Sequence, residues 1–193
     1  MRILLLLTAI GFCFSVYASG SLKWNAGILV TIDGQVQQGE LAFQVSEIVL
    51  FRTAGEVTVY PANKVHSFRY YDQEENINRK YVSHLSAYGR NASFYEVIVV
   101  GEVSVMRLLK SQRITDRKKS DLDDYDYFVL LEENLISLKQ FSNKVYPNLV
   151  YRSEQIPFLV KEQHLNPNQK ADAIRIVQLY NKVSYAETVV AGI

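Results

Sequence analysis

The sequence predicts a mainly β protein: an antiparallel meander curled into a barrel or sandwich, with short C-terminal helices packed on it, at the border of the α+β class. Two observations lead to this prediction. From Trp24 to about Leu138, hydrophobic residues alternate with a period of two between glycine, asparagine and aspartate turns, which is typical of half-buried strands. After Lys139 the period changes to that of helices.

Six strands are expected in the first half of the chain. Ile28, Val30 and Ile32 fall on one face of the first strand, and Asp33-Gly34 supplies a tight turn after it. Ala54-Gly55 turns a later pair of strands. The other five strands are expected at residues 39–43, 48–52, 56–60, 66–71 and 79–85.

The second half adds a central strand and a hairpin. Residues 94–100 are nearly all apolar, so this strand is expected to be covered on both faces. Strands 103–109 and 125–131 flank a polar stretch, residues 110–124, which is expected to be a long exposed loop. Residues 135–138 then pair with 125–131 across a Glu133-Asn134 turn.

The C-terminal segment is expected to form helices at residues 138–146 and 155–165, and a longer one that Asn166 caps and Pro167 opens. In the longer helix, hydrophobic residues at spacings of three and four form a stripe that is expected to pack on the sheet. They are Ala173, Ile176, Val177 and Tyr180. The tail at residues 183–193 fits either an edge strand or a disordered end.

Residues 49–65 and 129–145 resemble each other weakly. Val49-Leu50 and Asn63-Lys64-Val65 recur eighty residues later as Val129-Leu130 and Asn143-Lys144-Val145. A duplicated unit of one hairpin and one short turn would produce this pattern, and so would chance.

The first 18 residues predict a cleaved secretory signal. Arg2 precedes an apolar stretch from Ile3 to Phe14, and Val16-Tyr17-Ala18 supplies the small residues that signal peptidase accepts, so cleavage is expected after Ala18. Residues 19–193 are then one β-rich domain, helical from about residue 139, with no transmembrane anchor. The predicted location is periplasmic or extracellular, with outer-membrane association as one option.

Composition narrows the functional classes. The only cysteine lies in the signal, so the mature chain has neither a disulfide nor a thiolate nucleophile. The formal charge of +1 falls to zero when Arg2 is removed, which argues against nucleic acid as a partner. No GxSxG elbow, phosphate-binding glycine loop or dinucleotide fingerprint is present, so we predict no catalytic residues and no cofactor.

The stretch RKKSDLDDYDY at residues 117–127 contains the weak candidates for a metal site. With Asp121 at position 1 of a calcium loop, Asp123 falls at position 3 and Glu132 at position 12. However, position 6 is Asp126 instead of the required glycine. A solvated loop is therefore the favoured interpretation, in which local cations balance the aspartates: Arg117, Lys118 and Lys119.

Histidines and tyrosines are the remaining candidates. His66, His84 and His164 show no ligand spacing, although His66 and His84 could meet on neighbouring strands near Asp72. Tyrosines suit sugar and protein surfaces because they combine area with a hydroxyl. Tyrosine is equally a normal strand residue that fills the rim of a β core, and this is the favoured interpretation. Tyr125, Tyr127 and the three cations Arg117, Lys118 and Lys119 are the candidate binding surface.

Four features together resemble exported proteins of unknown function from Gram-negative bacteria. They are the signal, the Trp24-Asn25-Ala26-Gly27 strand opening, Lys64-Val65-His66-Ser67-Phe68, and a final helix ending in Leu179-Tyr180-Asn181. The resemblance implies export and a fold class but no mechanism. The leading hypothesis is a non-catalytic, envelope-associated binding or structural protein that contacts a cell-envelope protein or glycan through its sheet surface, an edge strand or the 110–124 loop. The alternative is a carbohydrate-directed hydrolase or lectin-like binder.

Overall fold

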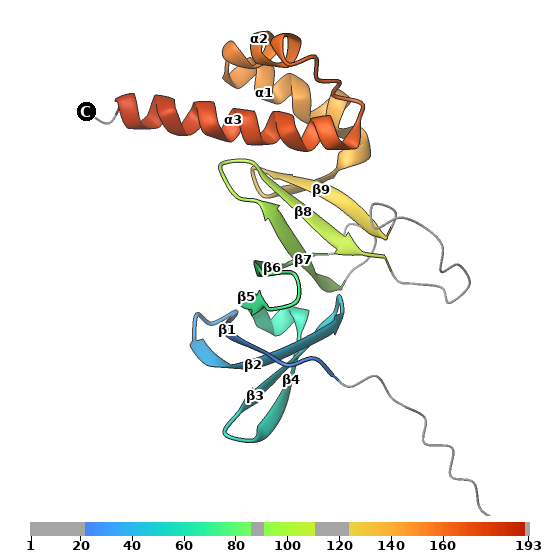
Figure 1. Ribbon diagram of the computed structural model, residues 1–193, viewed down its shortest axis with the longest axis vertical. Helices are drawn as coiled ribbons and strands as arrows, with labels where there is room; N and C mark the ends of the chain where they lie inside the picture. Colours follow the sequence, from blue (N-terminus) through green and yellow to red (C-terminus); the bar gives the residue numbers. More distant parts are fainter. Residues whose placement is uncertain (1–21, 86–90, 111–123, 192–193) are drawn as a thin grey trace, which may run out of the picture.

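The computed structural model describes residues 22–85, 91–110 and 124–191, which form one sheet of ten antiparallel strands followed by helices (Figure 1). The prediction of a mainly antiparallel β fold with C-terminal helices is confirmed, and the sheet is not closed into a barrel. The expected signal segment lies outside the described residues. Within the described ranges, no helix is long and apolar enough to cross a membrane.

Two meanders meet at the first strand. The first contains β1 (Asn25–Thr31), β2 (Val36–Val45), β3 (Ile48–Thr53) and β4 (Glu56–Pro61). The second contains β5 (Val65–Asp72), β6 (Ile77–Leu85), β7 (Ala92–Val99), β8 (Ser104–Leu109), β9 (Tyr125–Leu131) and β10 (Asn134–Ser137). The 3-10 turn η1 (Ala62–Lys64) leads from β4 to β5, which pairs with β1. The strand order is β10-β9-β8-β7-β6-β5-β1-β2-β3-β4, so β4 and β10 are the edges.

The hydrophobic row predicted for β1, Ile28, Val30 and Ile32, lies on the less buried face of the strand, and the opposite face is the buried one. Leu29 is fully buried and pairs with Phe68 of β5. Ile32, the last residue of the predicted row, is 65% exposed and lies beyond the end of the strand. An alternating pattern defines two faces, but tertiary packing decides which of them is covered.

Two hairpins use the same kind of turn. Ala54 and Gly55 between β3 and β4 have φ of 50° and 87°, and Glu132 and Glu133 between β9 and β10 have φ of 49° and 65°. Two consecutive positive φ values match the right-handed twist of the flanking strands. The Ala54-Gly55 turn is confirmed, whereas the second turn lies one residue earlier than Glu133-Asn134. Both hairpins lead to a short helical turn, so the similarity of 49–65 and 129–145 extends to local structure, while a duplication stays a prediction.

The front face of the sheet, the side with Phe68, Glu96 and Val105, carries two hydrophobic cores. The first lies over β1 to β7 and includes Leu29, Leu41, Val49, Phe51, Phe68 and Phe94. The second joins β8 and β9 to the helices and includes Val105, Val129, Leu131, Phe141, Leu149 and Ile176. β7 is buried on both faces, as predicted, because Phe94 is 1% exposed and Tyr95 is 0% exposed. We call the opposite side, with Arg69 and Lys80, the back face.

The helices lie at the β7–β10 end of the molecule (Figure 1). They are η3 (Leu138–Gln140), the π-helical η4 (Phe141–Val145), α1 (Tyr146–Arg152), α2 (Gln155–Glu162) and α3 (Lys170–Ala191). The predicted stripe of α3 is buried, with Ala173, Ile176, Val177 and Tyr180 at most 3% exposed. α3 begins later than predicted, because Asn166 Oδ1 accepts from the backbone N–H of Asn168 in a preceding turn. The tail forms neither an edge strand nor a disordered end up to Ala191, since α3 continues through it.

Candidate functional site

Most of the predicted loop site lies outside the described residues: Asp121, Asp123, Arg117, Lys118 and Lys119. Glu132 is described. It is exposed at the β9–β10 turn, where its carboxylate pairs with the guanidinium of Arg152. Over the described ranges, no three His, Cys, Asp or Glu side chains are grouped closely enough to hold a metal ion.

Tyr125 and Tyr127 both contact cations of the protein itself. The guanidinium carbon of Arg107 lies 4.2 Å from the ring centroid of Tyr125. Tyr127 is 9% exposed, and Lys170 Nζ lies 4.9 Å from its ring centroid. Tyr125 therefore remains near the surface, whereas Tyr127 belongs to the core beneath the helices.

His66 and His84 lie on neighbouring strands but not directly opposite each other. The register that pairs Ser67 with Val82 places His66 level with Ser83, and His84 pairs with Ser93 on the other side of β6. His84 Nδ1 lies 3.1 Å from its neighbouring Leu85 carbonyl. The two histidines are therefore not cross-strand partners in the sheet.

A row of ion pairs crosses the front face between the two cores. We call it the charge ladder and define it as Lys23, Asp72, Arg79, Glu96 and Arg107. Lys23 Nζ lies 2.8 Å from Asp72 Oδ1. Arg79 donates from Nε to Asp72 Oδ2 at 2.8 Å and from Nη1 to Glu96 Oε1 at 2.6 Å. Arg107 Nε donates to Glu96 Oε2 at 2.7 Å, which extends the ladder from β5 to β8.

The alternation of side chains along each strand places the ladder on the front face. Glu96 pairs directly with Tyr81 of β6 and with Arg107 of β8, so all three side chains lie on one side of the sheet. Asp72 ends β5, within reach of Arg79 near the start of β6. The side chains of Asp72 and Glu96 are 11% and 7% exposed, so these ion pairs are largely shielded from water.

The protonation states follow from these contacts. Hydrogen bonds from Lys23 and Arg79 hold the pKa of Asp72 well below its usual range, so this carboxyl stays charged at neutral pH. Burial raises the pKa of Tyr81 above its usual range, and its hydroxyl, hydrogen-bonded to that of Tyr70, stays protonated. Asp72 is therefore a fixed acceptor and is not suited to deliver a proton as a general acid.

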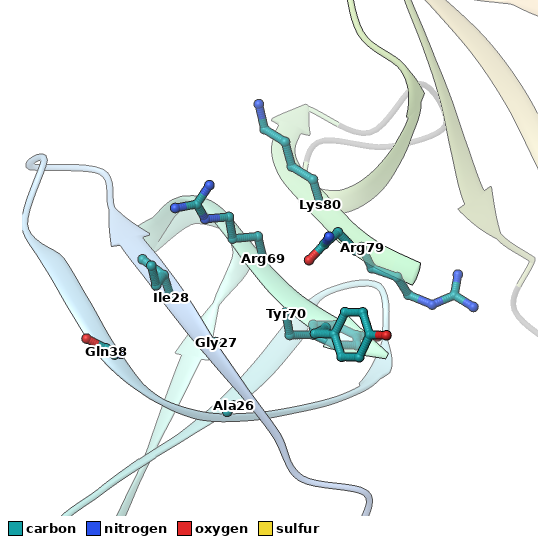
Figure 2. A pocket seen from close by; sticks show the side chains of 10 residues that line it. Ala26, Gly27, Ile28, Gln38, Arg69, Tyr70, Arg79 and Lys80 are labelled. Atoms are coloured by element: carbon teal, nitrogen blue, oxygen red, sulfur yellow. The ribbon is translucent and has the colours of Figure 1, made fainter. Parts of the chain in front are cut away.

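A second feature, on the back face, is an open hollow of about 590 Å³ over β2, β1, β5 and β6 (Figure 2). We call it the basic hollow. Cross-strand pairing places one row of side chains along it: Gln38, Ile28, Arg69 and Lys80. Figure 2 shows Arg69 and Lys80 beside each other, while the guanidinium of Arg79 extends away from them. Tyr71, 43% exposed, lines the hollow as well, together with Asn78, Ala26, Gly27, Tyr70 and Arg79.

Arg69 and Lys80 have no ion-pair partner in the part of the chain that the structure describes. They are direct cross-strand neighbours, an arrangement that is unfavourable for like charges. Every cation of the charge ladder, by contrast, has a carboxylate partner. The two faces of the same strands thus carry a neutralised network and an unpaired cationic pair.

Sequence patterns did not reveal either site. The ladder residues are spread from position 23 to position 107, and each strand that takes part contributes a single residue to the ladder, so no sequence motif connects them. One signal was available, because Glu96 interrupts the apolar run FYEVIVV, and a charge in a buried strand requires a partner. The identity of that partner depends on strand register, which cannot be determined from a single sequence.

Comparison with protein-family models, curated proteins and solved structures finds no match for this chain. The resemblance to exported Gram-negative proteins therefore stays a prediction. Functional conclusions rest on the chemistry of the two sites described above.

Proposed function

We propose that this protein is an exported, non-catalytic binding protein that takes an acidic segment of a cell-envelope partner protein into the basic hollow. The observation that carries the proposal is the cross-strand pair of Arg69 and Lys80, which has no carboxylate partner in the described chain. Two cations that repel each other within one hollow attract a ligand that brings carboxylates to both.

The lining of the hollow favours a polypeptide over a glycan. Ile28 lies beside Arg69 in the cross-strand row, and the exposed ring of Tyr71 lines the same hollow. These apolar surfaces match a segment in which acidic and aliphatic side chains are combined. A hydroxyl-rich acidic glycan would neutralise the cations but would leave the Ile28 side chain without an apolar partner.

The direct test uses a fluorescent peptide rich in glutamate and leucine, with a twin in which glutamine replaces glutamate. Fluorescence anisotropy should show binding of the acidic peptide only, weakening as salt rises from about 50 to about 500 mM. Arg69→Gln with Lys80→Gln should reduce affinity at least tenfold, or about 1.4 kcal/mol. The matched control is Lys144→Gln with Lys161→Gln, two exposed lysines on η4 and α2.

Three outcomes would contradict the proposal. Equal binding by the parent and the Arg69/Lys80 variant would show that the hollow does not bind the peptide. Loss of binding in the Lys144/Lys161 control would indicate attraction by overall charge. Tighter binding of polygalacturonate than of the peptide would assign the hollow to an acidic glycan. If the acidic peptide binds as expected, the natural partner is sought by cross-linking in the cell envelope, with the Arg69/Lys80 variant as the comparison.

Export is tested separately, because it rests on residues 1–18. The intact mass of the protein isolated from its own cells should correspond to a chain that begins at Ser19. Recovery from the periplasm or the medium would agree with cleavage. A protein that keeps Met1 and stays with the cytoplasmic fraction would refute export and the cell-envelope location of the partner, whereas binding of an acidic segment in the basic hollow is tested by the peptide alone.

A further inference from the structure

A separate pocket of about 220 Å³ lies on the front face, over the charge ladder. Its charged lining is Asp72, Arg79, Glu96 and Arg107, and its aromatic lining is Phe43, Tyr70, Tyr81, Phe94 and Tyr125. Tyr70 and Arg79 line both hollows, but Arg79 and Tyr81 alternate with Asn78 and Lys80 along β6, so the pocket lies on the opposite side of the sheet from Lys80. The two cations proposed to bind the partner segment, Arg69 and Lys80, do not line this pocket.

The charges that line the pocket cancel. Two carboxylates, Asp72 and Glu96, face two guanidinium groups, Arg79 and Arg107. Each carboxylate accepts from at least one of these guanidinium groups. A charged ligand would have to compete with these internal ion pairs, so the pocket has no net attraction for an anion or a cation.

Arg79, Arg107 and Glu96 are nevertheless held in place and retain hydrogen-bonding capacity, whereas Asp72 already accepts from Lys23, Arg79 and the backbone N–H of Glu74. A guanidinium has five N–H donors and an ionised carboxylate about four acceptor positions. Arg79 uses Nε and Nη1 within the ladder, and Arg107 is fixed both by Glu96 and by its stacking on Tyr125. Mutual ion pairing therefore orients donors and acceptors before any ligand arrives, which lowers the entropic cost of binding.

Aromatic rings form the walls around these charges. The ring centroids of Phe43 and Tyr81 are 4.6 Å apart, and Phe43 also packs edge-on against Phe94 at 5.9 Å. Tyr125 lines the pocket from β9, beneath Arg107. The pocket thus combines apolar walls with a few oriented polar groups, as small-molecule sites do.

We propose that this pocket binds a neutral, hydroxyl-rich ring, the chemistry of a single sugar unit. A hydroxyl both donates and accepts, so one ring can satisfy guanidinium donors and carboxylate acceptors together without disturbing the charge balance. The C–H faces of the ring would pack on the aromatic walls. One water molecule takes up about 30 Å³ in the liquid, so the pocket of about 220 Å³ has the volume of about seven waters. This volume suits one sugar ring and not a chain of several rings.

In the test, the mature protein is titrated with the methyl glycosides of glucose, galactose, mannose and N-acetylglucosamine. Binding is detected by saturation-transfer NMR. Ser46 lines the pocket, so Ser46→Trp should fill it and reduce binding at least tenfold. The control is Ser142→Trp on η4, which does not line the pocket. Arg107→Lys keeps the charge but loses the planar fork, and should also weaken binding at least tenfold. Melting curves establish that each variant is folded.

The results separate the two proposals. Arg69→Gln with Lys80→Gln should leave glycoside binding unchanged, whereas Ser46→Trp should leave peptide binding unchanged. The sugar proposal is overturned if none of the four glycosides binds at about 10 mM, a concentration that detects dissociation constants above about 1 mM. It is also overturned if folded Ser46→Trp binds as the parent does, or if methyl glucuronide binds more tightly than methyl glucoside.

Discussion

The side-chain amide of Asn181 hydrogen-bonds both backbone groups of Val103. Val103 N donates to Asn181 Oδ1 at 3.0 Å, and Asn181 Nδ2 donates to Val103 O at 2.7 Å. Val103 is fully buried, so few other partners are accessible to these groups. The contact attaches α3 to the chain just before β8, much as a neighbouring strand would.

Removal of this amide should destabilise the protein. Asn181→Ala leaves a buried N–H and a buried C=O unsatisfied, and we expect a loss of about 2–3 kcal/mol in the free energy of unfolding. Urea denaturation measures this loss. Asn148→Ala is the matched control, because Asn148 bonds a single carbonyl at an exposed position. If both variants lose the same amount, the contact with Val103 has no special role.

A side chain at Gly27 should also be destabilising. A Cβ there would lie 2.4 Å from the backbone oxygen of Arg69 and 2.6 Å from Leu41 Cδ1. Because backbone must move, Gly27→Ala should cost about 1–3 kcal/mol in thermal or urea unfolding. Gly55→Asn is the comparison: Gly55 has open space around it, and asparagine tolerates its positive φ. Equal stability of Gly27→Ala and the parent would contradict the close approach of β1 and β5.

Glu96→Gln tests whether the charge ladder acts as a unit. The substitution removes the carboxylate shared by Arg79 and Arg107 and leaves both guanidinium groups under-compensated in a largely shielded site. We expect a loss of about 2–4 kcal/mol, measured by urea denaturation. In Glu40→Gln, which breaks the exposed pair with Arg52, the loss should stay below about 1 kcal/mol. A smaller effect at Glu96 than at Glu40 would contradict the assigned burial.

The pH dependence of stability should reveal Asp72. Its pKa is lower in the folded protein than the value of about 3.9 for an unfolded chain, because Lys23 and Arg79 bond its carboxylate. The folded state therefore binds fewer protons, and this contribution is complete above about pH 5 and is lost as the pH falls below about 4. Asp72→Asn should be less stable than the parent at pH 7, and the difference should shrink towards pH 2. A difference independent of pH would show that the carboxyl charge is not involved.

Strands and helices were largely predictable because their signals are local. The alternation along residues 125–131 and the Ala54-Gly55 turn require only near neighbours, and both appear as expected. The one-residue error at the β9–β10 turn has a local cause, since Glu132 and Glu133 adopt positive φ without the glycine that normally marks such a turn. The start of α3 was misjudged because Asn166 caps a turn and not the helix.

The two sites were not predictable, for a different reason. Asp72, Arg79 and Glu96 look like ordinary strand charges when each is taken alone, as do Arg69 and Lys80. Their chemistry arises only when register brings Glu96 beside Arg107 and Arg69 beside Lys80. Tyr125 lines the front pocket beneath Arg107 of β8, a contact that its own sequence neighbourhood does not reveal, and the predicted binding surface around it stays a prediction.

The sequence by itself determined the fold class, the helical C-terminal segment and the positions of nearly all strands, because alternation and turn chemistry act over a few residues. Tertiary structure decided three further matters. It inserted β1 between β2 and β5, it chose the face of β1 that is buried, and it separated the paired charges on the front face from Arg69 and Lys80 on the back, which have no carboxylate partner among the described residues. Each depends on contacts between residues far apart in the chain, and a shift of one residue in register would exchange the two faces.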